Sequence, residues 1–361
     1  MIHQMNRPAI AHIYPEHLRH NYRLLKQHAG KADIMAIVKA NAYGHGIELV
    51  APVLFDEGCR LFGVTDAAEG RQLRLLLKTE KAEITLLSGI FDRQDARMAI
   101  DKHLTPAITE PVQVELLHME NFRGSVWLKV DTGMNRLGTS DAKALTRQCQ
   151  KAGIKVRGIM SHLACADMPE HLLNKQQANA FTILRREVTP NLPASLLNSA
   201  GMVSMPEYCL DVVRPGIALY GSEPVADQPL GLKPVMQLTG GVMQIRDIPA
   251  GAQVSYGATY TADSSMRIAV VSTGYADGLP RRLSNRGYAF FAGQKLDIVG
   301  RVCMDYTMLD VTDVEIKQGD TVEFWGTHIR ANDVARSIDT ISYTLFTGIG
   351  ARVQRIAEYS G

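Results

Sequence analysis

The sequence predicts an α/β protein: a (β/α)8 TIM-like barrel followed by a mainly β C-terminal domain. Eight short apolar or β-branched runs alternate with helical patterns over residues 34–219. Unusual polar residues stand at or just after the ends of these runs. From about residue 230, short strand-like runs separated by Gly, Pro and Asp replace this alternation. Parallel strands need crossover helices, and eight such units close a sheet into a barrel, whereas closely spaced strands and turns indicate an all-β unit.

The first part begins with an apolar stretch at residues 9–14 and an amphipathic helical pattern at 16–25. The eight strands are predicted at residues 34–39, 61–64, 84–88, 105–108, 126–130, 156–161, 194–197 and 212–219. A doubly wound open sheet has the same alternation, and periodicity alone does not exclude it. The polar residues favour the barrel, because there the strand ends meet at one face. They are Lys39, Arg136, His162, Asn198, Ser199 and Arg214.

The second part is predicted to contain strands at residues 235–238, 241–245, 268–271, 296–299, 308–311 and 321–324. A helical pattern covers 331–338, and a last strand-like run covers 351–356. We place the boundary near Pro229 and Pro234, which gives domains at residues 1–231 and 232–361. The first residues of the chain are a segment that could pack against the second domain.

Composition excludes several classes of protein. A formal charge of +2, without a basic arm, argues against a nucleic-acid partner. Five scattered cysteines without a CxxC pair read as free thiols in a reducing compartment, and no metal site is expected. Neither a signal segment nor a membrane-length apolar run is present. We therefore predict a cytoplasmic protein that does not bind a membrane, with its start at Met1 or Met5.

One lysine stands out from the barrel pattern. Lys39 ends the β-branched run 34–39, and a Tyr- and Gly-containing turn follows it. A buried lysine is costly unless its charge is paired or removed, and a lysine with a depressed pKa can form a Schiff base with a carbonyl compound. By itself this pattern equally describes a lysine that reaches from the strand end into solvent.

The whole phrase VKANAYGHG, residues 38–46, resembles the cofactor-lysine signature of the alanine racemase family. Members of this family use pyridoxal 5'-phosphate (PLP). The resemblance implies that Lys39 binds the cofactor covalently and that Tyr43 contacts its phosphate. The resemblance extends over nearly the whole chain through several motifs in family order. Such a joint pattern is stronger evidence for the family than a single motif.

The segment KVDTGMNRLG, residues 129–138, is similar to a second family motif. It implies that Arg136 contacts the cofactor's phenolic oxygen and the substrate carboxylate, for which the guanidinium fork is suited. Lys129 near Arg136 would place two cations together, which is unfavourable. Two hypotheses therefore stand side by side: a carbamylated, anionic Lys129, as in some family members, or an ordinary lysine paired with a carboxylate.

Two residues at later strand ends resemble the family's support for the cofactor ring. The resemblance implies that His162 hydrogen-bonds Arg214 and that Arg214 faces the ring nitrogen. A guanidinium is effectively never deprotonated, so that nitrogen stays neutral. A neutral ring is a weaker electron sink, which favours return of the proton to Cα over transamination.

The loops after the seventh and eighth strands match the family's phosphate cup. Asn198 and Ser199 offer side-chain groups, and Gly216 and Ile217 offer backbone N–H groups. Tyr220 joins Tyr43 in this expected set. Considered alone, Ser199 also reads as an ordinary helix cap.

The β domain carries two further family motifs, around Tyr256 and Met304. Racemisation needs a proton carrier on each face of Cα. The resemblance implies that Tyr256 takes the proton of L-alanine and Lys39 that of D-alanine, and that the Met304 N–H binds the substrate carboxylate. In the family, both segments reach the other subunit's cofactor, which implies a homodimer with shared sites.

The family's narrow entrance is matched by Tyr275, Tyr343 and Ala166, and its outer charged ring by Asp167, Arg281 and Arg301. We therefore expect a PLP-dependent alanine racemase that supplies D-alanine for peptidoglycan. The alternatives are a racemase of other or broader specificity, such as serine or lysine, a decarboxylase of the same fold, and a non-catalytic PLP-binding protein. The Arg214 motif argues against the decarboxylase, and the β domain argues against the binding protein.

Overall fold

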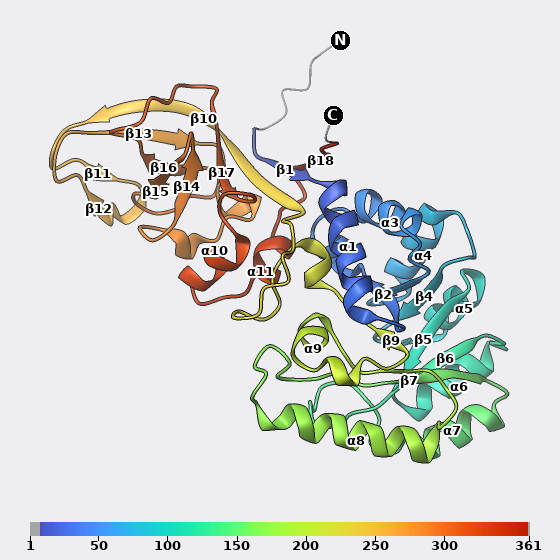
Figure 1. Ribbon diagram of the computed structural model, residues 1–361. Helices are drawn as coiled ribbons and strands as arrows, with labels where there is room; N and C mark the ends of the chain where they lie inside the picture. Colours follow the sequence, from blue (N-terminus) through green and yellow to red (C-terminus); the bar gives the residue numbers. More distant parts are fainter. Residues whose placement is uncertain (1–7, 360–361) are drawn as a thin grey trace, which may run out of the picture.

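The first region is a barrel of parallel strands in the computed structural model, which describes residues 8–359 (Figure 1). Its strands are β2 (Asp33–Ile37), β3 (Leu61–Val64), β4 (Glu83–Leu86), β5 (Leu104–Ile108), β6 (Ser125–Lys129), β7 (Lys155–Met160), β8 (Ala194–Ser195) and β9 (Val212–Val213). Each strand from β2 to β7 pairs in parallel with the next, and β9 pairs with β2. Backbone hydrogen bonds from Asp211 N to Ala194 O (3.1 Å) and from Arg214 N to Leu197 O (2.9 Å) close the ring. The predicted barrel is confirmed, and an open sheet is excluded.

Helices cover the outside of this barrel and follow the strands in sequence. They are α1 (Pro15–Ala29), α3 (Ile47–Asp56), α4 (Ala67–Leu77), α5 (Arg93–Asp101), α6 (Pro111–Met119), α7 (Ala142–Lys151), α8 (Leu172–Val188) and α9 (Ser199–Ser204). Four begin at a short acidic or amide side chain that accepts from the first-turn backbone: Asp66, Asp92, Asp141 and Asn198. Such caps satisfy N–H groups that have no partner within the helix, and so fix where each strand-to-helix loop ends.

The second region is built on a long strand, β10 (Met236–Ile248), which pairs with β1, β13 and β17. The other strands are β1 (Ile10–Ile13), β11 (Gln253–Val254), β12 (Tyr260–Thr261), β13 (Met266–Val271), β14 (Tyr288–Phe291), β15 (Gln294–Asp297), β16 (Thr307–Asp310), β17 (Thr321–Trp325) and β18 (Gln354–Ala357). Two helices, α10 (Ala331–Ser337) and α11 (Ser342–Thr347), lie on the side facing the barrel (Figure 1). The mainly β character expected for this region is confirmed.

The start of the chain joins the second sheet. β1 lies antiparallel to β10 and parallel to β18, with Ile10 opposite both Thr239 and Gln354. The segment predicted as able to contact the second region therefore does so from residue 10 onward. The alternative starts Met1 and Met5 lie outside the described residues, and the boundary at 231/232 stays a prediction.

Several predicted strand limits were wrong for identifiable reasons. The expected strands 235–238 and 241–245 are one strand, because Gly240 and Gly241 serve close packing and not a turn. A Cβ on Gly240 would lie 2.2 Å from Thr273 Oγ1, and one on Gly241 would lie 2.7 Å from Pro8 Cβ. The expected strand 212–219 ends at Val213, and a 3-10 turn follows at Ile217–Tyr220. Pro215 lies between them, and its missing N–H cannot continue the sheet.

β14 was not predicted, nor were the short strands β11 and β12. Within residues 8–359, no helix is long and apolar enough to cross a membrane.

Candidate active site

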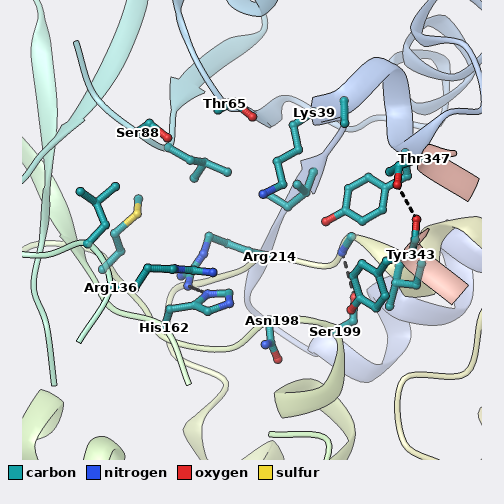
Figure 2. Close-up of a pocket in the computed structure, with 18 of the residues that line it drawn as sticks. Lys39, Thr65, Ser88, Arg136, His162, Asn198, Ser199, Arg214, Tyr343 and Thr347 are labelled. Carbon is teal, nitrogen blue, oxygen red and sulfur yellow. Dashed lines mark hydrogen bonds between the residues drawn. The ribbon is translucent and has the colours of Figure 1, made fainter. Parts of the chain in front are cut away.

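A cavity of about 540 Å³ opens at the ends of the barrel strands (Figure 2). Eleven of the residues singled out in the sequence line it: Lys39, Tyr43, Lys129, Arg136, His162, Asn198, Ser199, Arg214, Gly216, Ile217 and Tyr343. They come from distant parts of the chain and meet because the ends of parallel strands lie at one face. The barrel thus assembles the predicted polar set into one site.

Lys39 starts a short turn of unusual backbone, α2 (Lys39–Tyr43). Residues 40–43 have φ between +52° and +54°, the left-handed helical region, although none is glycine. L-residues occupy this region at a cost of about 1–2 kcal/mol each. Surrounding contacts must therefore hold the turn, and strain of this kind clusters at functional sites.

The contacts that hold the turn come from four directions. The Ala40 N–H donates to Glu69 Oε1 at 2.7 Å, and the Ile47 N–H donates to Asn41 Oδ1 at 2.8 Å. Arg355 Nε donates to Gly44 O at 2.6 Å. The His45 ring is buried, and Nδ1 lies 3.1 Å from Ala42 O and 3.0 Å from Tyr43 O.

Burial lowers the pKa of His45 to about 3, so the ring is neutral and Nδ1–H donates. Together these groups fix the direction in which Lys39 leaves the backbone.

The cavity carries positive charge. Among the described residues that line it are two lysines and two arginines, and no Asp or Glu. Burial, followed by the nearby Arg136 charge, lowers the pKa of Lys39. A lowered pKa raises the fraction of neutral amine near neutral pH, which a nucleophilic or basic lysine needs.

Lys129 is the second lysine of the cavity and is half-buried beside other cations. Its Nζ donates to Leu87 O at 2.8 Å. Burial, then the charges of Arg214, Arg136 and Lys39, lower its pKa to about 8. No ion pair joins Lys129 to a carboxylate of residues 8–359, and its carbamylation and its pairing with a carboxylate both stay predictions.

Arg214 is buried at the floor of the cavity and held by several acceptors. Its guanidinium donates to Ser195 Oγ, to Ser161 O and, at 3.2 Å, to Leu196 O. Nη2 also lies 3.3 Å from His162 Nδ1, the pair expected from the sequence (Figure 2). Burial lowers the pKa of Arg214 to about 10, so it remains charged near neutral pH.

His162 accepts from this arginine in its neutral form. Burial first, and then the Arg214 charge, lower its pKa well below the ordinary value. A neutral imidazole that accepts at Nδ1 carries its proton on Nε2. His162 therefore supports Arg214 and is poorly suited to act as a cation.

The loop after β8 is organised by two adjacent side chains. Asn198 Oδ1 caps α9 by accepting from the Gly201 N–H at 2.9 Å. Ser199 Oγ instead accepts from the Gly216 N–H at 2.8 Å and the Ala218 N–H at 3.3 Å. The reading of Ser199 as the helix cap is corrected, because the residue before it performs that task.

Gly216 permits a close approach in the same loop. A Cβ there would lie 2.5 Å from Tyr43 Oη. Tyr43 and Tyr343 lie with their rings 5.7 Å apart and both line the cavity. Hydroxyls and backbone N–H groups therefore gather at the α9 side of the site.

Tyr220 is not brought to the cavity. It is fully buried behind Tyr43, with ring centroids 5.0 Å apart, and its hydroxyl donates to Ile37 O at 2.9 Å. The expected contact of Tyr220 with a phosphate is therefore corrected to support of the Tyr43 ring from behind. Tyr343, which was predicted to lie at the entrance, lines the cavity where Tyr220 was expected.

Other predicted residues lie outside the cavity in this chain. Tyr256 is 72% exposed and Met304 is 52% exposed, both in the second region. Arg281 and Arg301 line a separate basic hollow, and Tyr275 is also exposed. Ala166 and Asp167 line a hollow that Tyr343 shares with the main cavity. One chain alone does not bring all the predicted groups together.

Sequence reasoning missed other residues around the cavity. Thr65, Leu87, Ser88 and Thr347 line it, and Glu69 supports it. Glu69 follows the cap Asp66 by three residues, so it read as an ordinary first-turn acid. Nothing in the local sequence indicates that its carboxylate bridges Thr65 N and Ala40 N, both at 2.7 Å.

Known proteins resemble this chain over nearly its whole length. The sequence model of the alanine racemase N-terminal domain matches residues 13–224, and that of the alanine racemase C-terminal domain matches residues 235–357. The chain belongs to the alanine racemase family. An alanine racemase of Brucella abortus is 39% identical over 366 aligned positions, covering 95% of this chain and 91% of the relative.

Solved structures of alanine racemases share the fold. The biosynthetic enzyme of Pseudomonas aeruginosa superposes with a TM-score of 0.91 at 36% identity, covering 98% of this chain and 100% of that one. The alanine racemase of Bartonella henselae, solved with covalently bound pyridoxal phosphate, has a TM-score of 0.90 at 35% identity and covers 97% and 99%. The similarity spans both the barrel and the second region of this alanine racemase family member.

Proposed function

We propose that this chain is a PLP-dependent alanine racemase that interconverts L- and D-alanine through Lys39 and Tyr256. The observation that carries the proposal is the cavity itself, in which a lysine of lowered pKa stands among cationic and N–H groups in an alanine racemase family chain. The covalently bound pyridoxal phosphate of the Bartonella henselae relative supports a cofactor lysine.

The cavity residues fit PLP. The cofactor brings a phosphate and a phenolate, and this cavity offers cations without a lining carboxylate among the described residues. Gly216, where a Cβ would meet Tyr43, leaves room for an anion between the hydroxyls and N–H groups of that loop. Tyr43, Ser199, Gly216, Ile217 and Tyr343 would hold the phosphate, with Asn198 capping the helix beneath. When bound, the cofactor acidifies the α-proton of an attached amino acid.

Two residues would carry the proton. Lys39 reaches one face of the substrate and, with its lowered pKa, accepts the proton of D-alanine. A lysine cannot reach the opposite face, so Tyr256 accepts the proton of L-alanine there. A tyrosine is ordinarily too weakly basic near neutrality, and the cationic cavity would favour its phenolate.

Arg214 would restrict the cofactor to racemisation. Its guanidinium is fixed by backbone and serine acceptors and does not give up a proton near neutral pH. Facing the cofactor's ring nitrogen, it would keep a proton off that atom. His162, neutral and hydrogen-bonded to it, would maintain this orientation.

Alanine would be bound through its carboxylate and selected by size. Arg136 and the Met304 N–H would bind the carboxylate. Tyr275 and Tyr343, with Ala166, would narrow the entrance to a small side chain. Asp167, Arg281 and Arg301 would form an outer charged ring that steers a zwitterion.

A complete site would need two chains. Tyr256 and Met304 are exposed in one chain and are not among the residues that line its own cavity. A homodimer in which each second region reaches the partner's cavity would bury these side chains and supply the second proton carrier. Pairing of this kind is isologous, so both sites form at once.

Lys129 is proposed to be carbamylated. Its neutral amine would add carbon dioxide and release one proton, and the anion formed would face Arg136 and Arg214 in place of a third cation. A pKa of about 8 leaves part of the amine neutral near physiological pH, as this addition requires. Intact mass measured under carbon dioxide-saturated, non-acidic conditions should show one added carbon dioxide, lost in a Lys129→Arg variant. A bare amine in high-resolution density would refute the modification.

Purified protein loaded with PLP tests the activity. Circular dichroism should show L-alanine and D-alanine each relaxing to the same racemate, with serine and lysine turned over more slowly. Lysine turnover faster than alanine turnover would favour the broader racemase. Release of carbon dioxide would favour the decarboxylase, and an unchanged signal would refute both racemase assignments.

We place the enzyme in the supply of D-alanine for peptidoglycan, as the family resemblance implies. The five cysteines are free thiols in the described structure, which supports the reducing cytoplasm as its location.

A further inference from the structure

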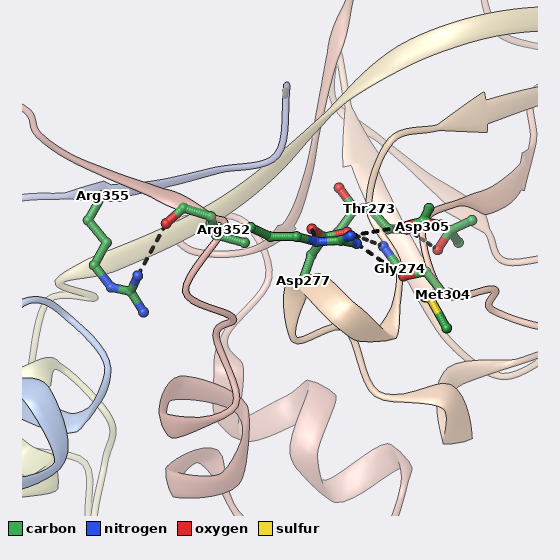
Figure 3. A network of polar contacts seen from close by, with 9 residues as sticks. Thr273, Gly274, Asp277, Met304, Asp305, Arg352 and Arg355 are labelled. Atoms are coloured by element: carbon green, nitrogen blue, oxygen red, sulfur yellow. Dashed lines mark hydrogen bonds and ion pairs between the residues drawn. The ribbon is translucent and has the colours of Figure 1, made fainter. Parts of the chain in front are cut away.

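A cluster of charges joins the segment before β18 to two loops of the second region (Figure 3). Arg352 Nε lies 2.7 Å from Asp277 Oδ1, and Nη2 lies 3.1 Å from Oδ2. The same guanidinium lies 2.8 Å from Asp305 Oδ1 through Nη1 and donates to Met304 O at 3.3 Å. One arginine thus contacts both loops with all three of its nitrogens.

The two loops are also bound to each other. Tyr275 N donates to Cys303 O at 2.9 Å, and Ala276 N donates to Met304 O at 3.0 Å. Asp277 Oδ2 accepts from Gly274 N at 2.9 Å. The loop that presents Tyr275 and the loop that presents Met304 therefore form one body, with the Asp277 carboxylate on its inner side.

Because Asp277 is buried, its ion pair with Arg352 matters for the stability of the two loops. Asp277 is 0% exposed, and a buried carboxylate without its cationic partner is strongly unfavourable. The bidentate fork fixes direction as well as charge, which a lysine at the same place cannot do. Arg352 itself is partly exposed. It therefore stabilises the loops by pairing with the Asp277 carboxylate and fixing its direction, and not by burying its own side chain.

Neighbours of Arg352 in sequence reach the chain's own cavity. Tyr343 of α11 lines that cavity, and Arg355 donates to Gly44 O at the end of the Lys39 turn. Residues 343–355 therefore contact both the chain's own cavity and the two loops of the second region. Arg352 is placed to act either on the chain's own site or, through the loops, on the partner's.

We propose that Arg352 is a positioning residue that, held by Asp277, aims the Met304 N–H at the substrate carboxylate and places Tyr275 at the entrance of the partner subunit's cavity. The proposal rests on the proposed racemase function and the shared site. The contacts favour action on the partner's site, because Arg352 contacts Met304 and Asp305 directly, whereas the contact with the end of the Lys39 turn is made by Arg355. A misplacement of about 1 Å in such a loop can cost about 10²-fold in rate or affinity.

The first test compares Arg352→Lys with a matched exchange elsewhere. Arg352→Lys should raise the KM for alanine about tenfold while kcat changes less than about threefold, because the loop binds a group that does not react. Absorbance of the bound cofactor should be unchanged. Arg97→Lys is the control. Arg97, on the outer helix α5, makes a similar two-point contact with Glu120, and its replacement should leave both constants unchanged.

A second variant protects this test against misfolding. Asp305→Asn removes the charge from one contact of Arg352 and leaves the buried pair with Asp277 in place. It should raise KM in the same direction by a smaller factor. An unchanged KM in both Arg352→Lys and Asp305→Asn would overturn the proposal, as would a loss confined to kcat.

Mixed dimers decide on which site Arg352 acts. Chains with Lys39→Ala and chains with Arg352→Lys, carrying different affinity tags, are co-expressed and the mixed dimer is isolated. In this dimer only the cavity of the Arg352→Lys chain keeps Lys39. That cavity receives the Met304 loop of the Lys39→Ala chain, in which Arg352 is intact. The KM of this dimer should therefore be that of the wild type. A KM that stays raised would show action on the chain's own site and overturn the proposal.

A further mixed dimer separates failure of this inference from failure of the proposed function. Lys39→Ala chains paired with Tyr256→Phe chains should regain activity, because one of the two cavities then has both proton carriers. If this pair stays inactive, the shared site is wrong. If it regains activity while the Arg352 results differ from expectation, the positioning role alone is wrong.

Discussion

Replacing Lys39 by alanine is expected to lower kcat for racemisation of both alanine enantiomers by about 10⁴-fold or more. The residue serves twice, as the attachment point of the cofactor and as the proton carrier on one face of Cα. Its lowered pKa, caused first by burial and then by Arg136, suits the neutral amine to both tasks. The measurement is the initial rate of change in circular dichroism from each pure enantiomer, at saturating PLP.

Two controls accompany this variant. Lys143→Ala removes a lysine of α7 that is paired with Glu187 at the barrel surface, and it should keep wild-type kcat. Thermal unfolding of the Lys39→Ala protein should show an intact fold, because the side chain is half-buried in a cavity and not packed in the core. Retention of more than about a tenth of wild-type kcat by a folded Lys39→Ala protein would contradict the covalent and basic roles together.

Replacing Tyr256 by phenylalanine is expected to lower kcat/KM for racemisation about 10³-fold, and equally from either enantiomer. The equality follows because the two enantiomers have the same free energy, so the forward and reverse efficiencies must fall together. The side chain is exposed in one chain, so the loss of one hydroxyl should not destabilise the fold. Cofactor binding through Lys39 should persist and is read from its absorbance.

Isotope exchange distinguishes the two proton carriers in this variant. Cα-deuterated D-alanine should still lose its deuterium to solvent, because Lys39 serves that face, while L-alanine should keep it. Tyr288→Phe, a matched change on β14, should affect neither exchange nor racemisation. Loss of deuterium from L-alanine at the wild-type rate would show that another group serves the Tyr256 face.

Local patterns were sufficient to predict much of the barrel. The run Leu61–Val64 is a strand with the predicted limits, since buried β-branched and aromatic residues between turn signals leave few alternatives. Lys39 was recognised from its place at a strand end and from the phrase that follows it. The shared direction of parallel strands then required the polar strand ends to meet, which the cavity confirms.

The errors arose where distant contacts decide a residue's task. Tyr220 has the same chemistry as Tyr343, and only the packing behind Tyr43 turns its hydroxyl to Ile37 O and away from the cavity. Asn198 and Ser199 are adjacent potential caps, and the approach of Gly216 N selects Ser199 for the loop and leaves Asn198 for the helix.

The left-handed turn at residues 40–43 also lay beyond the sequence. Ala and Tyr do not favour positive φ, and although Asn adopts it more readily, no propensity predicts four such residues in succession. Beside the local contacts of His45, Glu69 and Arg355 hold the turn from separate elements, and the Arg355 contact forms only when the barrel and the second region are assembled.

By itself, the sequence determined the alternation of strands and helices in the barrel, the family, and the chemical types available for catalysis, because periodicity and motif spacing are properties of neighbouring residues. The tertiary structure decided which of those groups share a cavity, how their charges shift the pKa of Lys39 and Lys129, and which loops Arg352 binds together. Burial, electrostatic interaction and backbone strain depend on atoms that lie close in space while far apart in the chain, and folding alone brings them together.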